Sequence, residues 1–282
     1  LNEWSHALAA LDARQPRAIF IDQIFGAVPD HAGFEPGAST EQKNEAHQLI
    51  DSIVKLQTPL ITAAFIRPTP IKRTEFKLDS EIYRFKSYFN SPTSMISRFP
   101  PMIQREGWHA YGPASALQAA FRRAGHTLNG GHGRVQGLIA LSGNTVMPHL
   151  ALMGAETPKI DHGRLIVNQS EVPLNQTGEL IPNFPSMRSY YENNRRLFNL
   201  VQPEKMAGTA EQVMPGDFVL IIPASFTGHA DFTDTPIGPM PGAFVLASIL
   251  NSRLTGSWIS EDQNTGMIEA IVIGLAALLY LP

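Results

Sequence analysis

Apolar residues near the start of the chain recur with helical spacing and then give way to short continuous runs. Residues 4–14 place four apolar side chains on one helical face, which predicts an amphipathic helix. The run RAIFID, residues 17–22, ends in Asp22 and predicts a short buried strand. A second helix is predicted over 41–56, with Thr40 as its N-cap. The expected buried stripes are Trp4, Ala7, Leu8 and Leu11 in the first helix, and Ala46, Leu49, Ile50, Ile53 and Val54 in the second.

A second strand is predicted over 59–65, so the order is strand, helix, strand. Such a βαβ unit has parallel strands joined by a right-handed crossover. Residues 66–112 are irregular, and FPPM at 99–102 must break any helix. Further helices are predicted over 114–124 (stopped by Gly125), 147–156 and 187–199, and further strands over 135–142, 164–168, 178–184 and 217–223.

This alternation of strands and helices predicts one α/β domain with a mostly parallel or mixed central sheet flanked by helices. The run 217–223, DFVLIIP, is nearly continuous in apolar residues, which predicts a strand buried on both faces. No polar linker divides the domain.

The stretch Thr227–Gly256 then runs through a loop rich in proline and glycine into an apolar helix over 242–254. Its three prolines (Pro236, Pro239 and Pro241) fix φ and stiffen the loop. Gly242 lets the backbone approach closely or take a positive φ before the helix. A catalytic loop, a ligand-cradling loop and a structural hinge all fit this composition.

The chain closes on twelve uncharged, mostly apolar residues from Ala270 to Leu281. By length alone this run suits a core helix, because a transmembrane helix needs about 20 residues. The run has no polar end, however, and a membrane span cut near its start would look the same. We expect a folded domain over 1–262, then a tether and the start of a transmembrane helix over 263–282.

Composition narrows the possible functions. The net charge of −3 gives no indication of nucleic acid or an anionic membrane surface as a partner. The absence of cysteine excludes thiol catalysis, cysteine-ligated zinc and disulfides. Neither G-x-S-x-G, nor G-x-G-x-x-G, nor a P-loop is present.

Three carboxylates, those of Asp22, Asp231 and Asp234, lie at or just after the ends of predicted strands, the edge at which open α/β sheets bind ligands. If the first and last clear strands are neighbours, these groups converge and suit a hydrolase or metal site. Alternatively, they hold turns through Asx hydrogen bonds. Five histidines (His126, His132, His149, His162 and His229) lie mostly beside glycine or proline without an HExxH motif, so we expect loop histidines and no metal site.

Taken in order, the segments RAIFIDQIF, TPLITAAF, ALQAAFRRAGHTLNGGHGRVQGLIAL, PHLALMGAE, NFP and FVLIIPASFTGHADFTDTPIGPMPGAFVLASILNSRLTGSWI resemble the type-two CHASE domain over almost the whole chain. CHASE stands for cyclase/histidine-kinase-associated sensory extracellular domain. The last segment is the most specific: Val219–Ile222, Asp231, Thr235–Pro236, Pro241–Gly242 and Ala247 match the family pattern. It departs at Pro223 (usually Gly), Ala243 (usually Val) and Leu246 (often His).

The resemblance implies a bacterial sensor domain without enzymatic activity of its own. It implies a position outside the cytoplasmic membrane, with one transmembrane helix before the domain and two or three after it. The implied cytoplasmic output is a nucleotide cyclase, a diguanylate cyclase, a histidine kinase or a Ser/Thr kinase, and the implied assembly is a homodimer. Residues 256–266 would form the tether. No cofactor and no nucleic-acid partner is expected.

Strand ends and the family match together select a candidate site for an unknown small-molecule or protein ligand. The candidate ligand-binding residues are Asp22, Asn129, His132, Asp231 and Asp234, and the candidate signalling hinge is Pro236, Pro241 and Gly242. Two alternatives remain: a periplasmic or membrane-anchored hydrolase using Asp22, Asp231 and Asp234, and a structural module that binds another periplasmic protein.

Overall fold

The structure is a computed structural model, and all structural statements below concern the residues that it describes. These are residues 2–22, 39–67, 103–105, 108–111, 123–141, 145–154, 158–161, 164–175, 178–185, 208, 210–222, 232–260 and 273.

The central sheet is mixed, with four parallel strands in the order β13, β1, β2, β5. A further strand, β4, is antiparallel to the last residues of β2. This confirms the predicted α/β fold and the parallel pairing of the first two strands. The strands are β1 (Ala18–Ile21), β2 (Leu60–Arg67), β4 (His109–Tyr111), β5 (Arg123–His126) and β13 (Phe218–Ile221).

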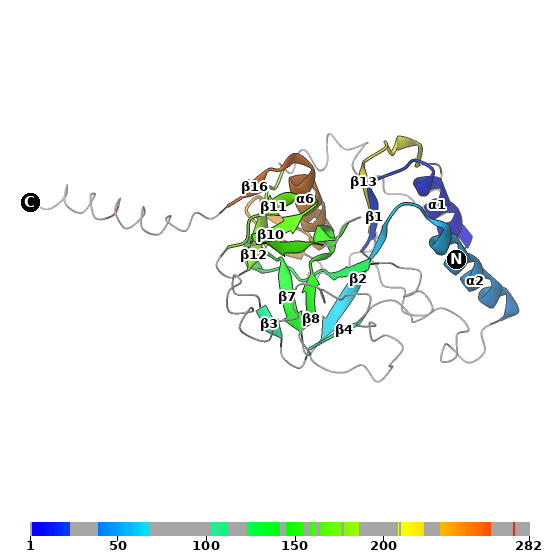
Figure 1. The fold of residues 1–282 in the computed structure, drawn as a ribbon, viewed down its shortest axis with the longest axis horizontal. Coiled ribbons are helices and arrows are strands. Elements are labelled where there is room, and N and C mark those ends of the chain that lie inside the picture. Colours follow the sequence, from blue (N-terminus) through cyan, green and yellow to red (C-terminus); the bar gives the residue numbers. More distant parts are fainter. Residues whose placement is uncertain are drawn as a thin grey trace, which may run out of the picture.

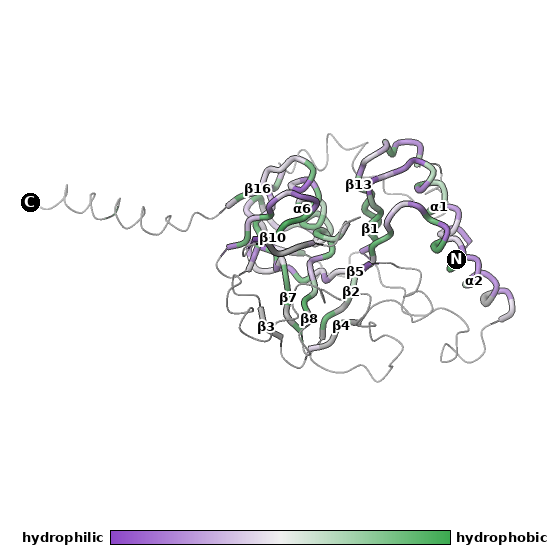
Figure 2. Tube along the Cα trace, in the orientation of Figure 1, coloured by the Kyte–Doolittle hydropathy of each residue, from purple (hydrophilic) through white to green (hydrophobic). Residues whose placement is uncertain are grey.

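Strand β1 is buried on both faces, and its alternating side chains belong to two different cores. Ile19 and Ile21 pack with α1 (Asn2–Asp12) and α2 (Thr40–Lys55), which cover one face of the sheet (Figure 1). Ala18 and Phe20 face the opposite way, into the larger core. Figure 2 shows hydrophobic colour along β1 and β2, whereas α1 and α2 carry hydrophilic stretches.

The stripes of the first two helices follow the predicted spacing with one exception. Ala7, Leu8 and Leu11 are buried, and so are Ala46, Leu49 and Ile53. The prediction that Val54 belongs to the buried stripe of the second helix is wrong, because this residue is 56% exposed. It lies about 80° around the helix from Ala46, on the side away from Leu49, because each residue advances about 100°.

The larger core fills the opposite face of the sheet with short strands, 3-10 turns and the helix α6 (Gly242–Thr255). Leu150–Leu152, the turn η4, lies between α6 and β5. The remaining elements are β3 (Ile103–Arg105), η3 (Gly131–Gly133), β6 (Val135–Gln136), β7 (Leu138–Leu141), β8 (Thr145–Pro148), β9 (Lys159–Asp161), β10 (Arg164–Val167), β11 (Ser170–Val172), β12 (Glu179–Pro182), η5 (Ala210–Gln212), β14 (Phe232–Thr235), β15 (Gly238–Pro241) and β16 (Trp258–Ile259). The strands among these elements form three small sheets, β3-β7-β8, β11-β10-β9 and β16-β12-β6, and the two-stranded pair β14-β15.

The predicted helix over 114–124 is wrong where it can be compared, because residues 123–126 form β5. Gly125 does not stop a helix. It lies within the strand, where an added Cβ would come within 2.6 Å of Leu150 Cα. The glycine is therefore required for close approach of η4 to the sheet. Residues 112–122 lie outside the described part of the chain.

The predicted helix over 147–156 is also wrong. Met147 and Pro148 instead pair with Ile139 and Leu138 in an antiparallel ladder, and η4 follows for a single turn. Pairing with a distant strand therefore overrides the local helical signal. The predicted helix over 187–199 lies outside the described residues.

Strand β13 lies where DFVLIIP predicts a strand, but its side chains are half-buried rather than buried on both faces. Among the described strands it pairs with β1 and no other, so it forms the edge of that part of the sheet. The expected strands over 135–142, 164–168 and 178–184 are confirmed as β6 with β7, β10 and β12.

The expected tether and membrane segment cannot be compared with the structure, because residues 261–282 lie outside the described part except for Ile273. None of the described helices combines the length and the apolar character needed to cross a membrane.

Candidate functional site

Residues 232–241 of the proline- and glycine-rich stretch form a β-hairpin. Strands β14 and β15 pair antiparallel, with Pro236 and Ile237 between them. The Thr235 hydroxyl donates to the Gly238 carbonyl at 2.6 Å and accepts from the Ile237 N–H at 3.4 Å. Gly238 takes the positive φ, 111°, that the sequence had suggested for Gly242.

The hairpin runs directly into α6. Pro241 ends β15 and is also the N-cap of α6, with φ −56° and ψ 140°. Gly242 is the first residue of that helix, and the predicted helix over 242–254 is confirmed. The helix ends at Gly256, whose φ of 69° is the left-handed conformation common after helices. Two of the expected hinge residues thus form the joint between hairpin and helix.

A loop from a distant part of the chain lies against this hairpin. The turn η3 contacts β14, and the Asn129 side chain donates to the Thr233 hydroxyl at 3.5 Å. A Cβ on Gly133 would come within 2.9 Å of the Phe184 ring and 3.0 Å of Pro236. The fold therefore gathers four of the residues selected from the sequence, and we call them the hairpin site: Asn129, His132, Asp234 and Pro236.

His132 is the most unusual residue of the hairpin site. Its backbone is left-handed, with φ 57° and ψ 37°, and its side chain is exposed. A residue with a Cβ pays of order 1–2 kcal/mol for this conformation. Such conformations persist where the surroundings impose them, and they occur often at binding sites. Asn129 and Asp234 are also exposed, so the site presents an imidazole, an amide and a carboxylate to solvent.

Glu179 holds the base of the η3 loop, and sequence reasoning missed it. Its carboxylate accepts from Gln136 Nε2 at 2.9 Å and from Asn175 Nδ2 at 3.3 Å. It also forms an ion pair with Arg134, with N and O atoms 3.6 Å apart. No sequence motif joins these residues. The pairing of β6 with β12 brings Gln136 and Arg134 to Glu179, and a local turn brings Asn175.

The candidate carboxylates are divided between different elements. Asp22 follows β1, and its N–H donates to the Ile221 carbonyl at 2.9 Å, so the first and last clear strands are indeed neighbours. Asp234 lies exposed on β14. Asp231 lies outside the described residues, and so do His162 and His229. The described residues contain no cluster of three potential metal ligands.

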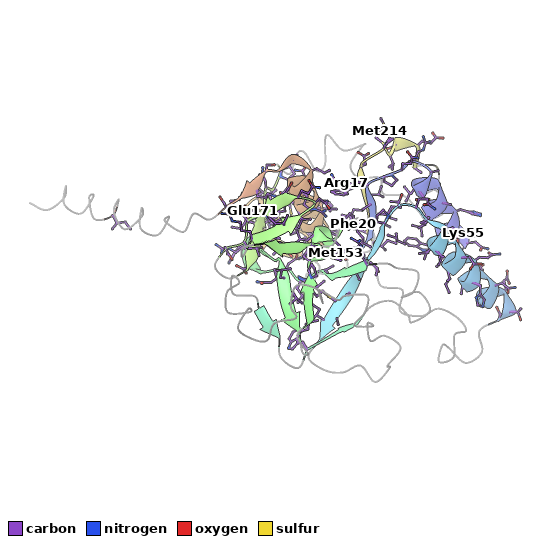
Figure 3. All side chains as sticks on the ribbon, viewed as in Figure 1. Arg17, Phe20, Lys55, Met153, Glu171 and Met214 are labelled. Carbon is purple, nitrogen blue, oxygen red and sulfur yellow. The ribbon has the colours of Figure 1, made fainter. Side chains whose placement is uncertain are left out.

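A cavity of about 320 Å³ lies between the strand β13, the β10–β11 turn and the end of α6, and no sequence pattern predicted it. One wall is formed by Arg17, which precedes β1, and by Phe218, the first residue of β13. A second wall is the turn between β10 and β11, and a third is the end of α6 with Trp258. Figure 3 labels Arg17 and Glu171 on the two parts of the molecule that border this cavity. We call it the arginine cavity.

Arg253 is the fixed cation of the arginine cavity. Its Nη1 donates to the Ala151 carbonyl and, at 2.7 Å, to the Met153 carbonyl. Its guanidinium carbon lies 4.9 Å from the centre of the Phe218 ring. Burial lowers the pKa of Arg253 to about 10, and the nearby charge of Arg17 contributes to this shift. The side chain remains charged at neutral pH.

Two of the expected loop histidines are buried: His126 ends β5, and His149 is the N-cap of η4. The rings of His126 and His149 stack edge to face, with centroids 5.2 Å apart. Each Nδ1 accepts a backbone N–H, from Leu128 at 3.2 Å and from Ala151 at 3.3 Å respectively. Burial lowers the pKa of His149 to about 3, and burial with the neighbouring His149 lowers that of His126. Both rings are therefore neutral, and they join β5 to η4.

Comparison with known families identifies a match over nearly the whole chain. The model of the family described as "CHASE2 domain" matches residues 2–281. No curated protein matches the chain, and no solved structure matches it.

Proposed function

Because the chain belongs to the CHASE2 domain family, whose members are sensory extracellular domains, we propose that it is the signal-input domain of a bacterial transmembrane receptor. The observation that carries the proposal is the family match over residues 2–281. The family is sensory rather than catalytic. The domain faces the periplasm or the exterior, and transmembrane helices connect it to the cytoplasm.

The hairpin site and α6 suggest how binding is communicated. The hairpin site collects side chains from the η3 loop and β14, and β15 continues into α6 through Pro241. Most of α6 is buried, including Val245, Ile249 and Leu250. Packed elements of this kind move as units between discrete arrangements. A ligand that shifts the hairpin therefore shifts α6, and the chain beyond Trp258 passes the shift to the membrane segment.

The output of such a receptor is a cytoplasmic nucleotide cyclase, diguanylate cyclase, histidine kinase or Ser/Thr kinase. We propose that the domain works as a homodimer, because enzymes of these kinds signal as dimers. The ligand is a small molecule or a protein. No nucleic-acid partner is proposed.

The location can be tested with single cysteines, because the chain has none of its own. Lys55→Cys at the exposed end of α2 should react with a membrane-impermeant maleimide when the full-length protein is in intact cells. Ala46→Cys, buried at 1% exposure on the same helix, is the matched control and should stay unlabelled. Labelling of Lys55→Cys only after lysis would place the domain in the cytoplasm and refute the proposal.

The communication step can be tested in the full-length receptor. Pro241→Ala combined with Gly242→Ala removes the fixed φ and the glycine at the joint, so the response of the attached output should fall. Gly208→Ala, at an exposed position outside both the hairpin and α6 where an added Cβ meets no atom within 4 Å, is the control. An unchanged response in the double variant would show that this joint does not carry the signal.

A further inference from the structure

The arginine cavity holds positive charge that no carboxylate of the described residues neutralises. Arg17 and Arg253 both lie over the Phe218 ring, with guanidinium carbons 5.6 and 4.9 Å from its centre. Glu171 also lines the cavity, but its carboxylate is already paired with Arg164 at 2.9 Å. Two like charges held around one ring repel each other, so a third group of opposite charge would stabilise them.

The position of Arg253 is explained in part by hydrogen bonds, whereas Arg17 has its contact with the Phe218 ring and no ion pair among the described residues. Arg253 lies in the last turn of α6, and a helix carboxyl end carries about half a negative charge. Its Nη1 also bonds two carbonyls, whereas its Nη2 is buried without a partner among the described residues. Arg17 makes no ion pair in that part of the chain, and its side chain is exposed beside the ring. The helix end therefore leaves more than one positive charge without compensation.

The rest of the lining is suited to a small amphiphilic molecule. Val167, Val172, Leu254 and Trp258 supply apolar surface, and Asn168 and Ser170 supply hydrogen-bonding groups. The volume of about 320 Å³ is near the lower end of the range for small-molecule sites, roughly 300–1,000 Å³. Guanidinium groups bind carboxylate and phosphate oxygens through paired hydrogen bonds.

We propose that the arginine cavity binds a small organic anion, with its carboxylate or phosphate group held by Arg17 beside Arg253 and its apolar part against Val172 and Trp258. This deepens the proposed sensory function and rests on it for its biological meaning. The cavity includes Leu254, Gly256 and Trp258, which lie at the end of α6 and the start of the expected tether. An anion bound there adjoins the segment leading to the membrane.

Binding can be measured on the 282-residue chain without any signalling output. The probes are benzoate and phenyl phosphate, with benzamide as the uncharged counterpart of benzoate. Titration by calorimetry and by thermal melting should show saturable binding and a higher melting temperature with either anion. Benzamide should give neither, since it lacks the charge that the arginines attract.

Variants assign the binding to this cavity. Arg17→Gln should weaken the binding of benzoate and phenyl phosphate by about tenfold or more, the loss expected for a charge-assisted pair. Arg14→Gln removes the same charge outside the cavity lining and should leave binding unchanged. Arg17 makes no hydrogen bond through its side chain in the described residues, so its replacement should not unfold the protein.

Three outcomes would overturn the proposal: no binding of either anion, equal binding of benzamide, or equal weakening by Arg14→Gln and Arg17→Gln. These results are independent of the labelling and signalling experiments. Failure of anion binding with external labelling of Lys55→Cys would leave the sensory function standing without this site. Anion binding with only cytoplasmic labelling would leave the site standing without the sensory function.

Discussion

The two faces of the sheet at β1 and β2 pack against side chains of different polarity. The face covered by α1 and α2 packs aliphatic side chains such as Leu8, Ile19 and Leu49, and α1 buries one polar side chain, Ser5. The opposite face shares its core with two buried histidines and the largely enclosed Arg253. An apolar face follows from burial alone, whereas buried polar groups cost free energy unless they are bonded. Burial alone therefore does not explain the histidines and the arginine on the face opposite α1 and α2.

The largest expected effect is on the helix-covered face. Leu49→Ala should lower the free energy of unfolding by about 2–5 kcal/mol, because Leu49 is fully buried between α2 and the sheet. Val54→Ala, on the same helix but 56% exposed, should change it by about 0.5 kcal/mol or less. Urea unfolding followed by circular dichroism measures both. Similar losses in the two variants would contradict the packing of α2 described above.

The opposite face should be sensitive to acid, because its histidines are neutral when folded. The lowered pKa values mean that the unfolded chain binds protons first, so stability is complete above about pH 6.5 and falls as the pH decreases. For His149 the loss continues to about pH 3, its folded pKa. Each neutral histidine should contribute about 1.4 kcal/mol per pH unit within this window.

Substitution of one buried histidine tests this pH dependence. His149→Asn keeps an acceptor for the Ala151 N–H but does not titrate, so it should make the pH dependence of unfolding shallower by about 1.4 kcal/mol per unit. An unchanged slope in His149→Asn would show that this ring is protonated in the folded protein.

A single methyl group added at Gly133 should destabilise the packing of η3 on the hairpin. Gly133→Ala should cost about 1–3 kcal/mol, because the φ is 75° and the new Cβ would meet Phe184 and Pro236. Gly131→Ala in the same turn meets no atom within 4 Å and is the matched control. Thermal unfolding compares them. Equal melting temperatures would mean that the η3 loop does not rest on the hairpin as described.

The smallest expected effect is at the turn that borders the arginine cavity. Asn168 and Gln169 join β10 to β11 with φ values of 50° and 67°, the left-handed conformation of a two-residue hairpin turn. Gln169→Gly should raise the free energy of unfolding by up to about 1 kcal/mol, because glycine takes this conformation without strain. Asn168→Gly should raise it less, since asparagine tolerates that conformation. A lower stability in Gln169→Gly would indicate that the Gln169 side chain makes a stabilising contact.

The sequence predicted those helices and strands whose burial follows from the pattern of their own residues. The spacing of Ala7, Leu8 and Leu11 and the run at 18–21 predict α1 and β1, because a buried helix stripe or strand must repeat with the geometry of its own backbone. The hairpin-to-helix stretch predicted α6, and the order of segments indicated the family that the comparison confirmed. In these cases the interactions that decide the structure follow from neighbouring residues.

Only the tertiary structure decided where distant residues meet. The local pattern predicts a helix stop at Gly125, whereas the close approach of Leu150 requires glycine in a strand there. Asn129 and Pro236 come from separate segments, and the packing of η3 against the hairpin brings them into one site. Arg17 and Arg253 lie near opposite ends of the chain, so no local pattern could indicate that both lie over the Phe218 ring. Backbone periodicity is a property of a segment, whereas a cavity is a property of the surfaces that the whole chain places together.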